Sequence, residues 1–284
     1  MPLFCFISGY FSKKLEKRQR TAFENLFIPF VVGQIVLGFM AIIINHNLSI
    51  IKNPLYAQYG TWYLIALFIW RILMPDLVKV KHIRLLSIAL FFLTPFFWGI
   101  DNTLGLQRVL GFFCFFLAGY FANKYKIDKI HKIPHWLCVS IFLFEMIALY
   151  TCFTKLHISY KQVFTVFVHG LTISKEIWNI PFVILSYIIA FGVAVLNSYL
   201  FLNLFYAASN KLAKIGEDTM PLYLSHLVMV QTYAATMRMF SDEIYILFSV
   251  PVGIAMIVGL SSKNYRNWFN KSMKAITWNI MKSE

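Results

Sequence analysis

Runs of apolar residues, separated by short segments that carry the charges, limit the fold of this chain more than any other feature. The runs occupy residues 24–44, 61–74, 85–100, 107–122, 134–152, 180–206, 219–240 and 244–262. A helix of about 20 apolar residues crosses the hydrocarbon core of a bilayer, so the sequence predicts an all-α, polytopic membrane helix bundle with about eight full spans.

Composition indicates a membrane protein without a sizeable soluble domain. The 284 residues are 59% hydrophobic and 13% charged, whereas about 25% of the residues of a soluble domain are charged. No repeat, Gly/Ser linker or low-complexity segment divides the chain. We therefore expect residues 1–262 to form a single transmembrane domain.

The basic residues alternate between the two sides of the predicted bundle. They collect in the segments 75–84, 123–133, 207–218 and 263–284. They are scarce in the loops 45–60, 101–106 and 241–243. Cytoplasmic loops carry the excess of positive charge, so the first group and the C-terminus should lie inside. The net charge of +14 is then a topological signal and does not indicate nucleic-acid binding.

Two segments need a separate interpretation. Segment 153–179 should be external by alternation, and its middle, 160–173, is apolar enough for a short interfacial or re-entrant helix. If 160–173 spans instead, every later segment inverts, although the basic tail argues against this. The tail 263–284 mixes aromatic and aliphatic residues with lysines, which predicts a basic amphipathic helix on the inner leaflet.

The chain opens on an apolar stretch that is too short to cross a membrane. Met1 to Phe11 would rise about 16 Å as a helix, whereas the hydrocarbon core is about 30 Å thick. The charges between Lys13 and Arg20 follow this stretch, and in a signal peptide they would precede it. We therefore expect an N-terminal half-span whose first half would be encoded upstream of Met1.

Four segments in order resemble motifs of acyltransferase family 3. MPLFCFISGYFSKK followed by NLFIPF resembles MPLFFFISGY and LLIPY, and GTWYLIALFIW resembles a helix with the pattern WFL-ALF. LQRVLGFFCFFLAGYFANK resembles R-x-L-x-FFPFFLLGYYL, and IGEDTMPLYLSH resembles IGxNTLxIYLxH. The resemblance covers residues 1–240, and it is similar to the fucose 4-O-acetylase-type branch, which acetylates bacterial surface glycans.

The resemblance implies a ten-helix enzyme of the bacterial plasma membrane. Such an enzyme moves an acyl group, usually acetyl, from cytoplasmic acetyl-CoA to a hydroxyl of a cell-surface or exopolysaccharide sugar. Acyl-CoA, the glycan and membrane lipids would be its partners, with no bound cofactor. Met1 aligns within the family's HMPLF, so the first helix, with the His regarded as catalytic, would lie upstream. An inactive remnant and a start codon placed too late both stay open.

Acyl transfer to a hydroxyl needs a group that removes its proton and donors that hold the oxyanion. A histidine suits the first task because imidazole titrates near neutral pH. His226 ends the YLSH motif inside the run 219–240. It is a catalytic candidate that would face the acyl-donor cavity, and a hydrogen bond between helices is the equal alternative. For the neighbouring Tyr223 and Ser225 we expect simple packing.

Three further residues are candidates. Arg108 matches the Arg before FFPFF and would bind the glycan acceptor or neutralise developing charge; a snorkelling anchor or an ion pair with Asp101 is the alternative. Glu145 lies mid-run and should face the bundle interior, as a catalytic or a structural group. Trp62 matches a family position and would stack on a sugar, or else belong to an aromatic belt.

The cluster of Lys13, Lys14, Lys17, Arg18 and Arg20 marks the cytoplasmic end of the half-span, and it would also attract the phosphates of acyl-CoA. The sequence contains no metal-binding motif, Gly-rich phosphate loop or Ser-nucleophile elbow, so we expect no metal. A glycan or lipid transporter or flippase is the alternative function. Such proteins often show internal repeats and broken paired helices, and neither is visible here. The oligomeric state is not predicted.

Overall fold

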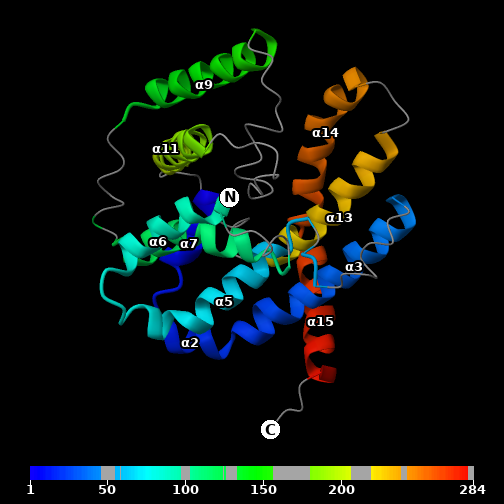
Figure 1. Ribbon diagram of the computed structural model, residues 1–284. Coiled ribbons are helices and arrows are strands. Elements are labelled where there is room, and N and C mark those ends of the chain that lie inside the picture. The colour runs from blue at the N-terminus through cyan, green and yellow to red at the C-terminus, as the bar shows by residue number, and fades with distance from the viewer. Residues whose placement is uncertain are drawn as a thin grey trace. The chain divides into compact units, whose positions relative to one another are not determined.

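A computed structural model describes residues 1–45, 55–57, 59–96, 103–123, 125, 133–155, 180–205, 219–237 and 242–280. All regular structure in these residues is helical, which confirms the all-α prediction (Figure 1). The α-helices are α1 (Pro2–Tyr10), α2 (Leu15–Arg20), α3 (Ile28–Asn45), α5 (Trp62–Leu77), α6 (Ile83–Leu93), α7 (Leu106–Phe121), α9 (His135–Lys155), α11 (Ile180–Phe205), α13 (Met220–Met237), α14 (Asp242–Leu260) and α15 (Lys263–Ile280). A π-helix, Phe23–Phe27, precedes α3, and a 3-10 helix, Thr94–Phe96, follows α6.

Each apolar run of the sequence corresponds to a helix, and most helix ends differ from the predicted ends by a few residues; the exception is α6, which ends at Leu93 and is followed by the 3-10 helix. Helix α2 was not predicted, because its charged residues were interpreted only as the end of a span. Residues 97–100, which belong to one predicted run, and the ambiguous segment 160–173 lie outside the described residues.

Two of the described helical segments, 23–44 and 184–205, are long and apolar enough to cross a membrane. Four shorter apolar segments occupy 83–96, 106–121, 135–148 and 248–260. The predicted number of eight full spans therefore stays a prediction.

Contacts divide the chain into two compact units. Unit 1 comprises Met1–Gln19 and Ile69–Ala208, and unit 2 comprises Arg20–Phe68 and Ser209–Glu284. The unit boundary falls inside α5, so its first residues pack in unit 2 and the remainder in unit 1. The expectation of one domain over residues 1–262 stays a prediction.

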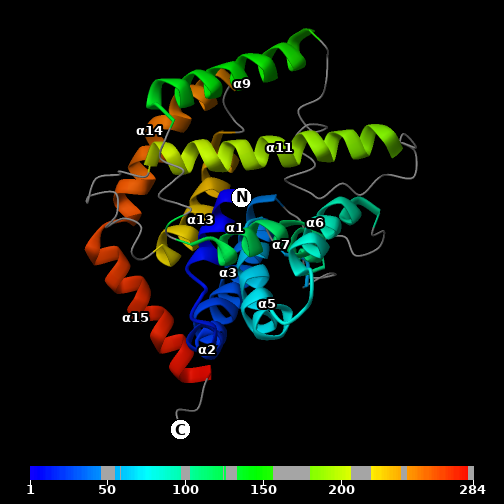
Figure 2. The same ribbon diagram turned by 90° about the vertical axis from the view of Figure 1, so that its left-hand side faces the viewer.

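Unit 1 is built on a close crossing of α1 and α7 (Figure 2). A Cβ atom added to Gly119 would lie 1.8 Å from the carbonyl oxygen of Phe6, and one added to Gly9 would lie 1.9 Å from that of Phe116. Small residues let helix backbones approach in this way, and the approach increases van der Waals contact between them. Each helix therefore needs a glycine where the other passes.

Helix α7 also anchors the part of α5 that lies in unit 1. The Trp70 side chain is 2% exposed, and its Nε1 donates to the carbonyl of Val109 at 3.1 Å. Its ring lies 4.9 Å from that of Phe116, which is fully buried. A buried indole N–H needs such an acceptor, so this bond sets the position of α5 against α7.

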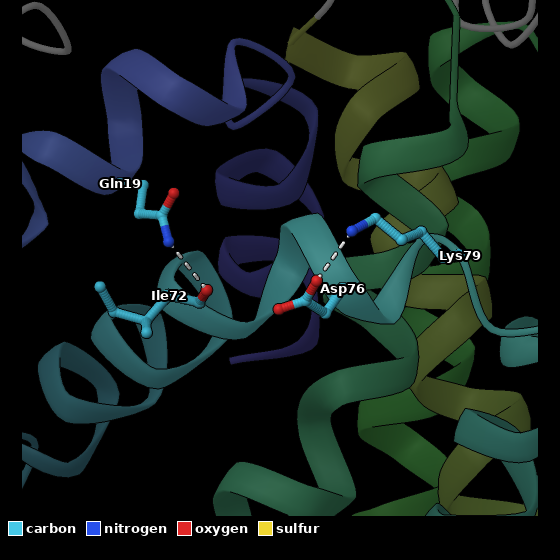
Figure 3. Close-up of polar contacts among 4 residues, drawn as sticks. All are labelled: Gln19, Ile72, Asp76 and Lys79. Carbon is cyan, nitrogen blue, oxygen red and sulfur yellow. Dashed lines mark hydrogen bonds and ion pairs between the residues drawn. The ribbon is translucent and has the colours of Figure 1, made fainter.

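The end of α5 contains Pro75, which has no N–H and so cannot bond the carbonyl four residues earlier in the helix. Close to this proline, Gln19 Nε2 of α2 donates to the carbonyl of Ile72 at 3.3 Å (Figure 3). Lys79 and Asp76 form an ion pair at 2.9 Å, with side chains 75% and 82% exposed. Such an exposed pair contributes little stability, so the Gln19 bond is the more informative contact between α2 and α5.

Unit 2 is organised around α13, which packs against α3, α14 and α15. A Cβ added to Gly33 of α3 would lie 2.9 Å from Leu224 Cδ2 of α13. The π-helix contributes Phe27, whose ring lies 5.2 Å from that of Phe68. The ends of α13 and α5 therefore belong to one packed group, and the YLSH motif lies within it.

The α1–α7 crossing predicts opposite effects for two glycine substitutions. Gly119→Ala should cost at least about 2 kcal/mol, because the new methyl group meets a backbone carbonyl that cannot rotate away. Gly192→Ala, in α11, should be neutral or stabilising by up to about 1 kcal/mol, because nothing lies within 4 Å of the added Cβ and alanine favours helices. Thermal unfolding of the purified proteins in detergent measures both. Equal melting temperatures for the two variants would contradict the crossing.

Candidate functional site

His226 is half-buried on α13, and its ring orientation is set by two neighbours on the same helix. Nδ1 lies 3.1 Å from the carbonyl oxygen of Leu222, and the ring makes an edge contact with Tyr223 at 5.5 Å. A carbonyl oxygen can only accept, so this bond requires the hydrogen on Nδ1. In the neutral ring, Nε2 is then the nitrogen with a lone pair, and within the described residues no protein group bonds it.

Tyr223 joins α13 to the turn that precedes α5. Its hydroxyl donates to the carbonyl of Gly60 at 2.5 Å, and its ring lies 5.6 Å from that of Tyr63. The Gly60 carbonyl also accepts from the backbone N–H of Tyr63 at 3.1 Å, so both of its lone pairs are used. A Cβ at Gly60 would lie 2.8 Å from Leu227 Cδ2, so α13 passes directly over this turn.

A second series of hydrogen bonds in unit 2 links the same turn to α3. Thr61 is fully buried, and its hydroxyl donates to Gln34 Oε1 at 2.5 Å. Gln34 Nε2 in turn donates to the carbonyl of Tyr56 at 2.9 Å. The sequence analysis missed both residues. Gln34 is a polar residue in the middle of an apolar run. Placing a polar group inside a membrane span costs free energy, so Gln34 could have been recognised from the sequence as a residue that needs a partner.

Trp62 follows this turn and is 3% exposed. Its ring contacts Tyr63 at 6.1 Å. The side chain is therefore packed within the protein, and this structure leaves no face of the ring open to a ligand. Stacking on a sugar stays a prediction.

Ser225 and Tyr265 form a hydrogen bond between their hydroxyls. The bond attaches α15 to α13 next to His226. The sequence interpretation favoured simple packing for Tyr223 and Ser225. The structure gives both hydroxyls specific partners instead, because those partners lie far away in the sequence and only the fold brings them close.

In unit 1, Arg108 is half-buried near the start of α7, three residues after Gly105, whose φ of 66° is left-handed. The adjacent Gln107 is 3% exposed, and its Nε2 donates to the carbonyl of Thr94 at 3.0 Å. Asp101, the alternative ion-pair partner of Arg108, lies outside the described residues. The role of Arg108 therefore stays a prediction.

Glu145, also in unit 1, lies on one face of α9 with Cys138 and Phe142, at spacings of seven and three residues. That face meets α11: Asn203 Nδ2 lies 3.0 Å from Cys138 Sγ, and Phe142 lies 5.0 Å from Phe201. Glu145 Oε1 is buried and has no hydrogen-bond partner among the described residues. This oxygen therefore points away from solvent, and the catalytic role of Glu145 stays a prediction.

The basic cluster contains two kinds of side chain. Lys13 donates to the carbonyl of Ala122 just after α7 and lies 4.4 Å from the Tyr10 ring centre, so it neutralises the negative end of the α7 dipole. Lys14, Lys17 and Arg20 are exposed, as Lys13 itself is, and the side chain of Arg18 is not described. The bond to Ala122 therefore sets Lys13 apart, while exposure lets an anion approach the other three.

Among the described residues, no group of three or more His, Cys, Asp or Glu side chains is arranged to hold a metal ion. The candidates also divide between the units, with His226 and Trp62 in unit 2 and Lys13, Arg108 and Glu145 in unit 1. Among these candidates, His226 therefore has the most fully defined surroundings.

Comparison with known families identifies the class of this protein. The family model described as an acyltransferase domain matches residues 1–273. The chain therefore belongs to acyltransferase family 3, and the match extends beyond the predicted residues 1–240 into α15. The search of curated proteins and the search of solved structures found no match. The fucose 4-O-acetylase-like branch stays a prediction.

Removal of the Tyr223 hydroxyl tests the attachment of α13 to the turn. Tyr223→Phe should lower the free energy of unfolding by about 1 kcal/mol, because one buried hydrogen bond is lost while the ring contacts remain. Tyr120→Phe is the matched control, because no described group bonds its hydroxyl. Thermal unfolding in detergent should separate the two variants, and an unchanged Tyr223→Phe protein would mean that the Gly60 contact contributes nothing.

Proposed function

We propose that this protein is a multi-pass O-acyltransferase of the bacterial plasma membrane. It would move an acyl group, in the first instance acetyl, from acyl-CoA to a hydroxyl of a cell-surface or exopolysaccharide sugar. The family match over residues 1–273 supports acyl transfer. One hydrogen bond extends the proposal to a particular residue. His226 Nδ1 bonds the carbonyl of Leu222, which leaves Nε2 as the nitrogen that can accept a proton.

The chemistry follows from that tautomer. A sugar hydroxyl attacks the thioester carbonyl of acyl-CoA, a C–O bond forms, and the C–S bond breaks. The hydroxyl proton passes to His226 Nε2 and from there to the departing thiolate of CoA. A base held in a fixed orientation accelerates such a step by about 100-fold to 10,000-fold, and the Leu222 and Tyr223 contacts supply that orientation.

The basic candidates would act on the substrates. Exposed Lys14, Lys17 and Arg20 would attract the phosphates of acyl-CoA on the cytoplasmic side, because basic loops of membrane proteins lie inside. Arg108 would hold the glycan acceptor or neutralise negative charge as it develops. The C-terminus would be cytoplasmic by the same charge argument.

Substitution of His226 tests the proposal in cells. The gene is expressed from its native locus with its upstream sequence, and ester-linked acetate is measured in the surface polysaccharide. His226→Gln should lower the ester content about 100-fold or more, since glutamine cannot take the proton.

His82→Asn is the matched control, because His82 is exposed and left-handed, with φ 60°, and asparagine tolerates this conformation. It should leave the ester content unchanged at equal protein levels. Wild-type ester content in His226→Gln would contradict the role of Nε2. Polysaccharide without acetate in the wild type, together with glycan movement that needs no acetyl-CoA, would favour a transporter.

A further inference from the structure

Helix α15 has two faces that differ in their contacts. The half-buried face carries Tyr265, Phe269, Met273 and Ile276, which recur every three to four residues along one side of the helix. This helix contacts α13 and α14, and the hydrogen bond between Tyr265 and Ser225 attaches it to α13. The apolar side of this amphipathic helix therefore contributes to packing within unit 2.

The opposite face is exposed and carries tryptophan and lysine. Trp268 is 62% exposed and Trp278 is 69% exposed, and Lys271 and Lys274 are exposed between them. Residues 263–280 contain four basic residues and no acidic one. Helix α15, which is the red helix of Figure 1, is therefore positively charged, and both of these tryptophan side chains are mostly exposed.

Charge complementarity decides what covers this face. Indole rings favour the level of lipid headgroups, where one edge is apolar and the other is wet. Lysines near a membrane are attracted by anionic headgroups. A second copy of α15 would instead bring the same positive charges into contact, and like charges disfavour association.

We propose that this exposed face of α15 binds a membrane surface of anionic phospholipids, with Trp268 and Trp278 at the level of the headgroups. The apolar face keeps the helix on unit 2, and the Tyr265–Ser225 bond fixes it beside the YLSH motif. The proposal concerns lipid binding and does not depend on the acyl-transfer chemistry.

Tryptophan quenching by brominated lipids tests this surface. The purified protein is reconstituted with phosphatidylcholine and phosphatidylglycerol, of which one or the other is brominated. The difference in fluorescence between the wild type and Trp268→Phe/Trp278→Phe isolates these two rings. Brominated phosphatidylglycerol should quench this difference signal several-fold more than brominated phosphatidylcholine does.

Charge variants separate the proposal from its competitors. Lys271→Gln/Lys274→Gln should abolish the preference for phosphatidylglycerol, whereas Lys79→Gln, which removes an exposed charge outside unit 2, should preserve it. Circular dichroism checks that the helices persist. Equal quenching by both lipids would overturn the anionic preference, and no quenching by either would overturn membrane contact. A signal that depends on protein concentration and not on lipid would indicate self-association instead.

Discussion

The backbones of α1 and α7 approach so closely that neither helix can carry a side chain at the crossing. Gly9 and Gly119 make this possible, each facing a carbonyl of the other helix. The consequences extend through unit 1, because α7 also contacts α6 and receives the Trp70 bond from α5. Lys13 then bonds the carbonyl that follows α7, so the end of α1 and the end of α7 are joined a second time.

The helices were predictable because the pattern that indicates a helix lies within the helix's own residues. Long apolar runs bounded by charged residues predicted the helices from α3 to α14 that the structure describes, and the amphipathic pattern of the tail predicted α15. Helix α2 was missed because Lys17, Arg18 and Arg20 were interpreted as a topological signal, which says nothing of backbone conformation. The Gly9–Gly119 crossing could not be predicted, since a glycine in one run does not indicate which other run approaches it.

In the candidate site, too, local sequence features were predictable and contacts between distant segments were not. The motif IGEDTMPLYLSH indicated His226 from the sequence, and the structure adds the tautomer that the Leu222 carbonyl requires. The partners of Tyr223, Ser225 and Thr61 are separated from them in the sequence by 163, 40 and 27 residues. Such pairs depend on packing, so they became visible only in the folded chain.

The YLSH segment is thus held from two directions within unit 2. Tyr223 fixes it to the Gly60 turn, and Ser225 fixes it to α15. Between these attachments, His226 retains a nitrogen that can accept a proton. A rigidly held acceptor is what general base catalysis requires, and the acyltransferase family match gives that acceptor a reaction to serve.

The central claim is that the protein transfers an acyl group from acyl-CoA to a glycan. Radiolabelled acetyl-CoA, supplied to the cytoplasmic face of membrane vesicles that contain the native gene product, tests it most directly. The account predicts base-labile label in the polysaccharide fraction and none in vesicles from a deletion strain. Equal labelling in both, or glycan that crosses the membrane without label, would contradict it.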